Sequence, residues 1–199
     1  MGASRRFAAI AAVAAVLVSG GCAVGTAQGP TGDAGGEEAA MSRTPVTRFT
    51  PLTEDDGYVP EGEGLDVDAD VPALTRLDAD LLAAVREAAE AAEAAGVEEV
   101  VVISGWRSER YQEFLWDAAV DLYASEEEAR RWVASPEGSA HVTGEAVDIG
   151  RTEAAYWFSR FGAEYGLCQT YANEVWHYES VVEPGEECPL PADDASVRR

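Results

Sequence analysis

The sequence contains no lysine and only two histidines among its 199 residues. All 14 basic side chains are therefore arginines, and they stand against 37 acidic ones, which gives a formal net charge of −23. Such an acid excess repels phosphate backbones and argues against nucleic acid as a partner. Because histidine is so scarce, any imidazole-based site must use His141, His177 or both.

Long apolar runs are scarce as well, and the one present lies near the N-terminus. Residues 7–18 form an unbroken apolar stretch after two arginines, too short to span a bilayer comfortably, which favours an export signal. Small residues then precede Cys22, as in lipoprotein signals, where the cysteine is lipidated and becomes the mature N-terminus. We expect residues 1–21 to be a signal peptide that places a lipoprotein on the outer face of the cytoplasmic membrane. An ordinary secretory signal, with release to the cell wall, is the alternative.

Cysteine is rare, since Cys168 and Cys188 are the only ones besides Cys22. An even pair in an oxidising compartment predicts a disulfide, worth about 3 kcal/mol through its constraint on the unfolded chain. Two thiols in a metal site are the alternative, but this pair lacks the close spacing of such sites. We therefore predict that Cys168 and Cys188 are bonded to each other.

The remaining chain divides into a linker, one domain and a tail. Residues 22–45 contain almost no large apolar side chain and predict a flexible linker, whereas residues 46–190 carry a core, and residues 191–199 form a tail. The expected helices cover 78–95, 108–123, 125–133 and 152–165, and the expected strands cover 99–104, 146–149, 167–171 and 175–181. Helices followed by a late antiparallel pair predict an α+β domain with a small, mainly antiparallel sheet.

Both histidines lie near carboxylates. His141 and Asp148 are seven residues apart, too far for one helical face, but they converge if the chain reverses at Gly144. His177 supplies the second imidazole. Two histidines and one carboxylate suit zinc in a hydrolase, with a fourth coordination position left for water.

Three sequence elements, in this order, extend that reading. They are Ser104-Gly105-Trp106-Arg107-Ser108 followed by Gln112, then Ser139-x-His141-x-x-Gly144-x-Ala146-x-Asp148, then Glu174-x-Trp176-His177. Together they resemble the VanY-like D-alanyl-D-alanine carboxypeptidases, zinc peptidases of the group that includes hedgehog-like folds. Trp106 stands where that family usually has tyrosine. The resemblance implies a hedgehog/DD-peptidase-like zinc fold for residues 46–190.

The resemblance also implies the metal ligands and the base. His141, Asp148 and His177 would hold Zn²⁺, and Glu174 would be the catalytic base. Strand periodicity alone favours another base, because residues three apart on a strand face opposite sides, and Glu179 would share the face of His177. We predict Glu174, placed in a turn before the strand begins, and keep Glu179 as the alternative.

Three further residues are implied to meet the substrate. Arg107 would bind it and polarise its carbonyl, and arginine suits a carboxypeptidase because it pairs with a free carboxylate through two hydrogen bonds. Gln112 and Ser139 match family positions that contact the terminal D-residue. All three are substrate-binding predictions.

The predicted function is zinc-dependent removal of the C-terminal D-Ala from peptidoglycan stem peptides in cell-wall remodelling. We expect a monomer, held at the membrane through its N-terminal lipid. One alternative is an L,D-carboxypeptidase acting on tetrapeptide stems, which the sequence does not separate from the first reading. The other is a non-catalytic zinc-fold module that binds peptidoglycan, against which the presence of both Glu174 and Arg107 argues.

Overall fold

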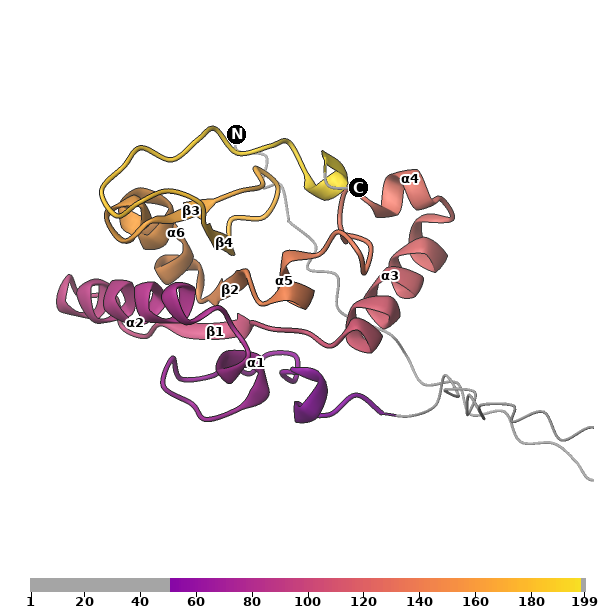
Figure 1. The fold of residues 1–199 in the computed structure, drawn as a ribbon, viewed down its shortest axis with the longest axis horizontal. Coiled ribbons are helices and arrows are strands. Elements are labelled where there is room, and N and C mark those ends of the chain that lie inside the picture. Colours follow the sequence, from indigo (N-terminus) through magenta and orange to yellow (C-terminus); the bar gives the residue numbers. More distant parts are fainter. Residues whose placement is uncertain (1–50, 198–199) are drawn as a thin grey trace, which may run out of the picture. The chain divides into compact units, whose positions relative to one another are not determined.

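The computed structural model of the chain describes residues 51–197. They form helices around a four-stranded sheet (Figure 1), which confirms the predicted α+β class. The helices are α1 (Pro72–Thr75), α2 (Ala79–Ala94), α3 (Glu109–Tyr123), α4 (Glu126–Ala129), α5 (Ala140–Thr143) and α6 (Thr152–Phe161). Short 3₁₀ turns are η1 (Glu54–Asp56), η2 (Gly162–Tyr165) and η3 (Ala195–Val197). The strands are β1 (Val101–Ser104), β2 (Ala146–Gly150), β3 (Leu167–Gln169) and β4 (His177–Ser180).

The sheet has the strand order β1-β2-β4-β3, and each neighbouring pair is antiparallel. The last strand in the sequence, β4, therefore lies inside the sheet, between β2 and β3. In β1 the register shifts between Val102 and Ser104, which brings Ser104 opposite Asp148. Such irregularities re-aim side chains at one end of a strand, and this one lies beside the candidate site.

The apolar core forms where α2 and α6 pack against the sheet. Helix α2 begins after Asp78, whose carboxylate accepts hydrogen bonds from the N–H groups of Asp80 and Leu81. Its buried face follows the predicted apolar stripe and includes Leu81 and Val85. From the sheet, the fully buried Tyr178 donates its hydroxyl to the carbonyl of Ala155 in α6, at 2.6 Å.

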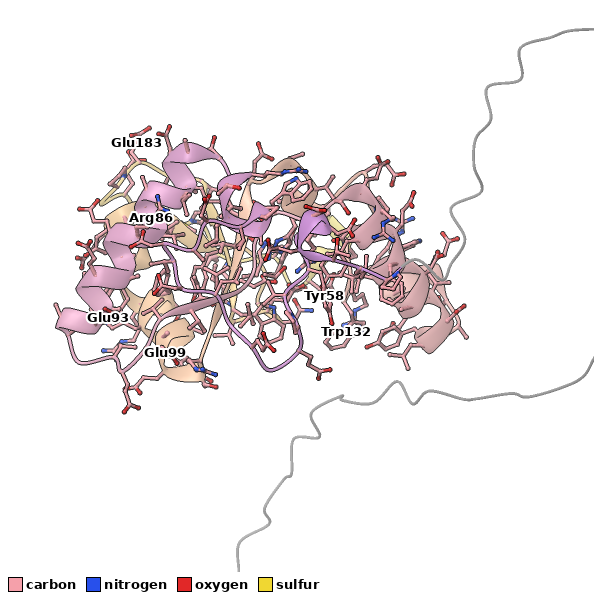
Figure 2. The ribbon with its side chains drawn as sticks, turned by 90° about the horizontal axis from the view of Figure 1, so that it is seen from below. Tyr58, Arg86, Glu93, Glu99, Trp132 and Glu183 are labelled. Atoms are coloured by element: carbon pink, nitrogen blue, oxygen red, sulfur yellow. A yellow bond between two sulfur atoms is a disulfide. The ribbon has the colours of Figure 1, made fainter. Side chains whose placement is uncertain are left out.

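Charged side chains cover the outside of this core. Figure 2 shows Arg86, Glu93, Glu99 and Glu183 at the periphery of the fold, directed away from it. Within residues 51–197 no helix is long and apolar enough to cross a membrane. The buried titratable side chains are few: Asp56, His141, Asp148, His177, Glu179 and Asp194. Three of these are the predicted metal ligands.

Two local predictions are wrong. Helix α3 begins after Ser108 as expected, but its predicted apolar stripe is not buried: Phe114 is 56% exposed, and the buried residues are Gln112 and Ala119. The reason is that α3 packs mainly on the short helix α4 and not on the sheet. The predicted loop 135–145 contains a single helical turn, α5, which carries His141.

The C-terminal chain returns to the domain. Cys168 is bonded to Cys188, as predicted, with 5.6 Å between their Cα atoms. Beyond this disulfide, Ala192 pairs with Tyr171 in a parallel bridge and Ala195 is buried, so residues 191–197 pack on the domain instead of leaving it as a tail. The expected signal peptide, the lipidated Cys22 and the linker 22–45 lie outside the described residues.

Candidate metal centre and active site

The sheet places three of the site's side chains in one row. Ser104 of β1 lies opposite Asp148 of β2, and Asp148 lies opposite His177 of β4. Residues directly opposite on antiparallel strands share a face of the sheet, so their side chains meet. The strand pairing therefore fixes one carboxylate and one imidazole side by side, 3.1 Å apart between Asp148 Oδ1 and His177 Nδ1.

The second imidazole arrives from the turn before β2. His141 lies on α5, and Gly144 ends that turn with a φ of +80°. A side chain at Gly144 would also meet the carbonyl oxygen of Arg76 at 2.5 Å, so the position requires glycine for two reasons. The reversal brings His141 Nε2 to 3.3 Å from Asp148 Oδ1, as the sequence spacing predicts.

The three inner atoms form a nearly equilateral triangle. His141 Nε2, Asp148 Oδ1 and His177 Nδ1 are separated by 3.1, 3.2 and 3.3 Å, and each residue is at most 5% exposed. Ligand atoms about 2.0–2.1 Å from a tetrahedral zinc ion lie about 3.3 Å from one another. Within residues 51–197 this is the group whose donor atoms lie close enough to hold a metal ion. The donor set and its spacing therefore fit zinc.

The outer ring nitrogens set the orientation of both imidazoles. His141 Nδ1 lies 2.8 Å from the carbonyl oxygen of Gly105, and His177 Nε2 lies 2.9 Å from Glu179 Oε1. Both partners accept hydrogen bonds, so the proton of each neutral ring belongs on its outer nitrogen. The inner nitrogens then present lone pairs to the centre of the triangle, as metal ligation requires.

The two imidazoles differ in protonation. Burial lowers the pKa of His141 to about 4, and the nearby Arg107 lowers it further, so this ring is neutral at pH 7. Burial also lowers the pKa of His177, but hydrogen bonds to Asp148 and Glu179 outweigh it and raise the pKa to about 9. In the metal-free protein His177 therefore carries a second proton, on the inner nitrogen, and a bound cation would displace it.

Glu174 and Glu179 occupy opposite sides of His177. Glu174 lies in the loop between β3 and β4, lines the cavity described below, and has an oxygen 3.9 Å from the inner nitrogen of His177. Burial raises the pKa of Glu174 to about 7, and the carboxylate of Asp148 adds to this rise. Glu179 contacts the outer nitrogen and accepts a hydrogen bond from Thr170 at 2.9 Å. Strand alternation thus identifies the residue that orients His177, while Glu174 has the position a base needs.

Arg107 is held at the edge of the triangle by three side chains. Its guanidinium donates to Ser104 Oγ at 2.8 Å, to Gln112 Oε1 at 3.1 Å and to Asp148 Oδ2 at 2.8 Å. Burial raises the pKa of Asp148, but His141 and the other basic neighbours outweigh burial and hold it well below its ordinary value. Since a guanidinium has five N–H groups, two of those on Arg107 remain for a ligand in the cavity.

The two predicted contacts to the terminal residue differ in their surroundings. Gln112 is 1% exposed, and its amide is used on both sides, accepting from Arg107 and donating to the carbonyl of Ala134 at 2.8 Å. It therefore supports Arg107 from behind. Ser139 lines the cavity, and its hydroxyl makes no hydrogen bond to the residues that the structure describes, so it can bind a ligand.

All of these groups surround one cavity of about 200 Å³. Its lining comprises Arg107, Gln112, Leu115, Trp132, Val133, Ala134, Ser139, Ala140, His141, Asp148, Tyr171, Glu174, Trp176, His177 and Ala195. The cavity is small, buried at its metal-binding end, and lined by aromatic and aliphatic side chains with a few polar groups. This composition is typical of ligand sites.

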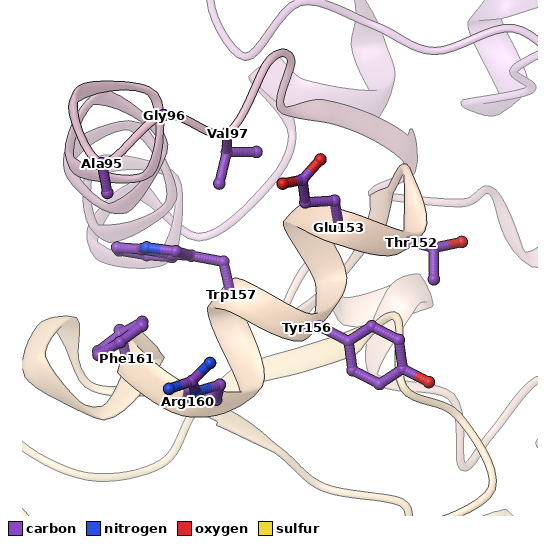
Figure 3. Close-up of a pocket in the computed structure, with 9 residues that line it drawn as sticks. All are labelled: Ala95, Gly96, Val97, Thr152, Glu153, Tyr156, Trp157, Arg160 and Phe161. Atoms are coloured by element: carbon purple, nitrogen blue, oxygen red, sulfur yellow. The ribbon is translucent and has the colours of Figure 1, made fainter.

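A larger cavity of about 560 Å³ lies elsewhere, between the end of α2 and helix α6 (Figure 3). Its lining includes Trp157 and Phe161, with Glu153 and Arg160 as its charged residues. It contains no histidine or cysteine and no second carboxylate, so it has neither metal ligands nor an acid–base pair. The smaller cavity is therefore the candidate active site.

The sequence analysis gave no role to several residues that line the active-site cavity. Tyr171 packs its ring on His177, with 5.0 Å between the ring centres, and Trp132 and Trp176 remain 46% and 40% exposed. Trp176 lies inside the third sequence element, so that element was the available signal. Nothing in the local sequence around Ala195 points to the cavity.

The chain is similar to a family of known proteins. A family model described as VanY, D-alanyl-D-alanine carboxypeptidase, matches residues 74–183, which is more than half of the chain. Among curated proteins, no sequence matches significantly.

Solved structures with the same fold include three described as peptidoglycan or resistance peptidases. VanYB in complex with D-alanine-D-alanine is 25% identical, with 61% of this chain and 80% of that chain covered and a TM-score of 0.50. A VanY D,D-pentapeptidase variant in complex with Zn(II) is 24% identical, with 64% and 88% covered and a TM-score of 0.49. The LdcB LD-carboxypeptidase is 26% identical, with 52% and 58% covered and a TM-score of 0.46. This chain thus spans less than two thirds of the LdcB chain.

Proposed function

The chain belongs to the VanY family of D-alanyl-D-alanine carboxypeptidases, and from this premise we propose that it is a zinc-dependent carboxypeptidase. It removes the C-terminal D-alanine from peptidoglycan stem peptides during cell-wall remodelling. The observation that carries the proposal is the convergence of His141, Asp148 and His177 with Glu174 and Arg107 at one cavity. The D-alanine-D-alanine bound by VanYB supports the class of substrate.

The chemistry requires a metal and a base at the same place. Zinc, when held by the three ligands, supplies Lewis acidity: it polarises a carbonyl oxygen and lowers the pKa of a water to about 7. Glu174 takes a proton from the water that attacks the carbonyl carbon. As the peptide C–N bond breaks, Glu174 passes this proton to the nitrogen of the departing D-alanine. A pKa of about 7 suits both halves of this transfer.

Arg107 contributes fixed positive charge. Its position is set by Ser104, Gln112 and Asp148 before any substrate binds, and its two remaining N–H groups face the cavity. Donors that are already oriented stabilise the negative charge developing on the carbonyl oxygen without a further cost of reorganisation. We assign Arg107 to that oxygen and the hydroxyl of Ser139 to the terminal residue of the substrate.

The test is release of D-alanine by the purified protein. Pentapeptide and tetrapeptide stems are incubated separately with zinc-loaded enzyme, and free D-alanine is measured over time. Rapid release from the pentapeptide and slow release from the tetrapeptide is the expected result. The opposite preference would make the enzyme an L,D-carboxypeptidase, and release from neither would contradict the proposal.

We further propose that the protein works outside the cytoplasm as a lipoprotein, anchored through Cys22. The disulfide between Cys168 and Cys188 supports export, because such bonds persist in oxidising compartments. The test is detergent phase partitioning of the protein from its native membrane. The wild type is expected in the detergent phase, and a Cys22→Ala variant that also enters that phase would contradict the anchor.

A further inference from the structure

The C-terminal segment, residues 189–197, forms part of the wall of the active-site cavity. Beyond the disulfide at Cys188, the chain runs back across the fold and ends close to α4 (Figure 1). On its way it pairs with the loop between β3 and β4: Ala192 donates its N–H to the carbonyl of Thr170 at 2.9 Å and accepts from the N–H of Ala172 at 2.7 Å. Two residues further on, Ala195 lines the cavity.

One ion pair fastens this segment to the opposite wall. Asp194 is 8% exposed, and its Oδ2 accepts a hydrogen bond from Arg131 Nε at 2.9 Å. The other oxygen of Asp194 accepts from the N–H of Ser196, which fixes the carboxylate in place. Arg131 directly precedes Trp132, which lines the cavity, so the pair joins the last turn of the chain to that wall.

The same arginine contacts the loop that carries the base. The carbonyl oxygen of Arg131 accepts a hydrogen bond from the side-chain NH₂ of Asn173, at 2.8 Å. The other end of this amide, Asn173 Oδ1, is buried and has no partner among the described residues. Asn173 therefore depends on the Arg131 carbonyl for its orientation, and Glu174 is the next residue in the chain.

From these contacts we propose that Asp194 is a positioning residue for Glu174. It holds Arg131, whose backbone holds Asn173, and the paired backbone at Ala192 holds the other side of the same loop. The role assigned to Glu174 rests on the proposed function, whereas the positioning of its loop does not.

The expected effect is on geometry more than on stability. The side chain of Arg131 is 52% exposed, and ion pairs with an exposed partner contribute little to the free energy of unfolding. A small displacement of a catalytic group is costly to rate, since an error of about 1 Å costs on the order of 100-fold. We expect partial displacement in Asp194→Asn, with kcat reduced about tenfold.

The experiment compares Asp194→Asn with Asp193→Asn in the full chain. Asp193 is adjacent and exposed, so it controls for the loss of one negative charge. Amide hydrogen exchange over residues 170–176, zinc content, thermal midpoint, kcat and KM are measured for each. In Asp194→Asn we expect faster exchange in that loop and a lower kcat, with KM, zinc content and thermal midpoint close to the wild type. In Asp193→Asn we expect no change.

A second variant tests the route through Arg131. If Asp194 acts through this residue, Arg131→Gln reproduces the loss, and the double variant with Asp194→Asn loses no more than either single variant. Additive losses would overturn the proposed route. Arg131→Gln also provides the test should Asp194→Asn fail to fold.

The outcomes separate this inference from the proposed function. Exchange and kcat in both variants equal to those of Asp193→Asn would overturn the positioning role, as would a loss of zinc in parallel with the loss of rate. Faster loop exchange in a protein whose wild type releases no D-alanine would support the positioning of the loop and contradict the proposed function.

Discussion

The molecule contains two buried regions of opposite chemistry. The apolar core includes side chains that are 0–1% exposed: Leu74, Leu81, Val85, Phe158 and Tyr178. The polar cluster is almost as deeply buried, at 1–5% exposure: Gln112, Ser139, His141, Asp148, His177 and Glu179. Burial favours the first group, because apolar surface leaves water, and it penalises the second, whose polar groups lose hydration.

The cluster offsets this penalty through hydrogen bonds and ion pairs among its own members. Asp148 alone contacts Arg107 through one oxygen and both imidazoles through the other. Apolar side chains would fill such a space at lower cost, and a paired buried charge is weak support for stability. We conclude that the core maintains the fold and that the cluster is retained for chemistry. Substitutions in the two regions should therefore fail in different ways.

The largest expected effect is in the cluster. His177→Ala removes one of three metal ligands, so we expect zinc to be lost and D-alanine release to fall by more than about 10³-fold. Metal analysis of the purified variant, alongside the activity assay, checks this. Equal zinc in the variant and the wild type would show that the metal lies elsewhere.

The next effect separates the two glutamates. In Glu174→Gln we expect kcat to fall by about 10²–10⁴-fold while zinc remains bound, because the base is lost and the ligands are not. In Glu179→Gln we expect zinc affinity to weaken by about 10–100-fold, with kcat restored at saturating zinc, since only the orientation of His177 is disturbed. Near-normal turnover in the first variant and none in the second would reverse the assignment of the base.

In the core, the expected loss is one of stability alone. Phe158→Ala removes a ring that is 1% exposed and should lower the free energy of unfolding by about 3–5 kcal/mol, measured by denaturant titration. Phe114→Ala, on the exposed side of α3, is the matched control and should change it by at most about 0.5 kcal/mol. Zinc stoichiometry of the folded protein should remain that of the wild type in both. A folded Phe158→Ala protein without zinc would show that the two regions are not separable.

The smallest effect is a pH dependence of the metal-free protein. The folded-state pKa of His177, about 9, lies above its ordinary value of 6.5, so its protonation stabilises the fold fully below pH 6.5. This contribution is lost as the pH rises through 9. We expect the thermal midpoint measured with chelator to decline from pH 6.5 to 9. Zinc-loaded protein should lack this decline, because the metal replaces the proton; a parallel decline in both forms would contradict it.

The sequence was informative about the site where local motifs carry the chemistry. His141, Asp148 and Gly144 lie within one short element, and the glycine between them predicted the reversal that brings the two side chains together. The position of Glu174 before β4 was also predicted correctly, since the alternation of a strand begins only at His177.

Other features depend on tertiary contacts that leave no local pattern. The spacing of apolar residues on α3 predicted a buried stripe at Phe114, but periodicity does not report whether another element covers that face. The pair between Arg131 and Asp194 joins residues 63 apart. For the same reason, the residues after 190 were expected outside the domain that they help to complete.

The position of β4 within the sheet has a consequence for how the protein matures. Because β4 inserts between β2 and β3, which are both synthesised earlier, each of those strands lacks this partner until β4 arrives. The strand that completes the pairing also carries His177, and pairings distant in sequence form late in folding. An incompletely folded chain therefore offers a metal ion two ligands and not three. Capture of the metal is thereby reserved for chains whose sheet has already closed.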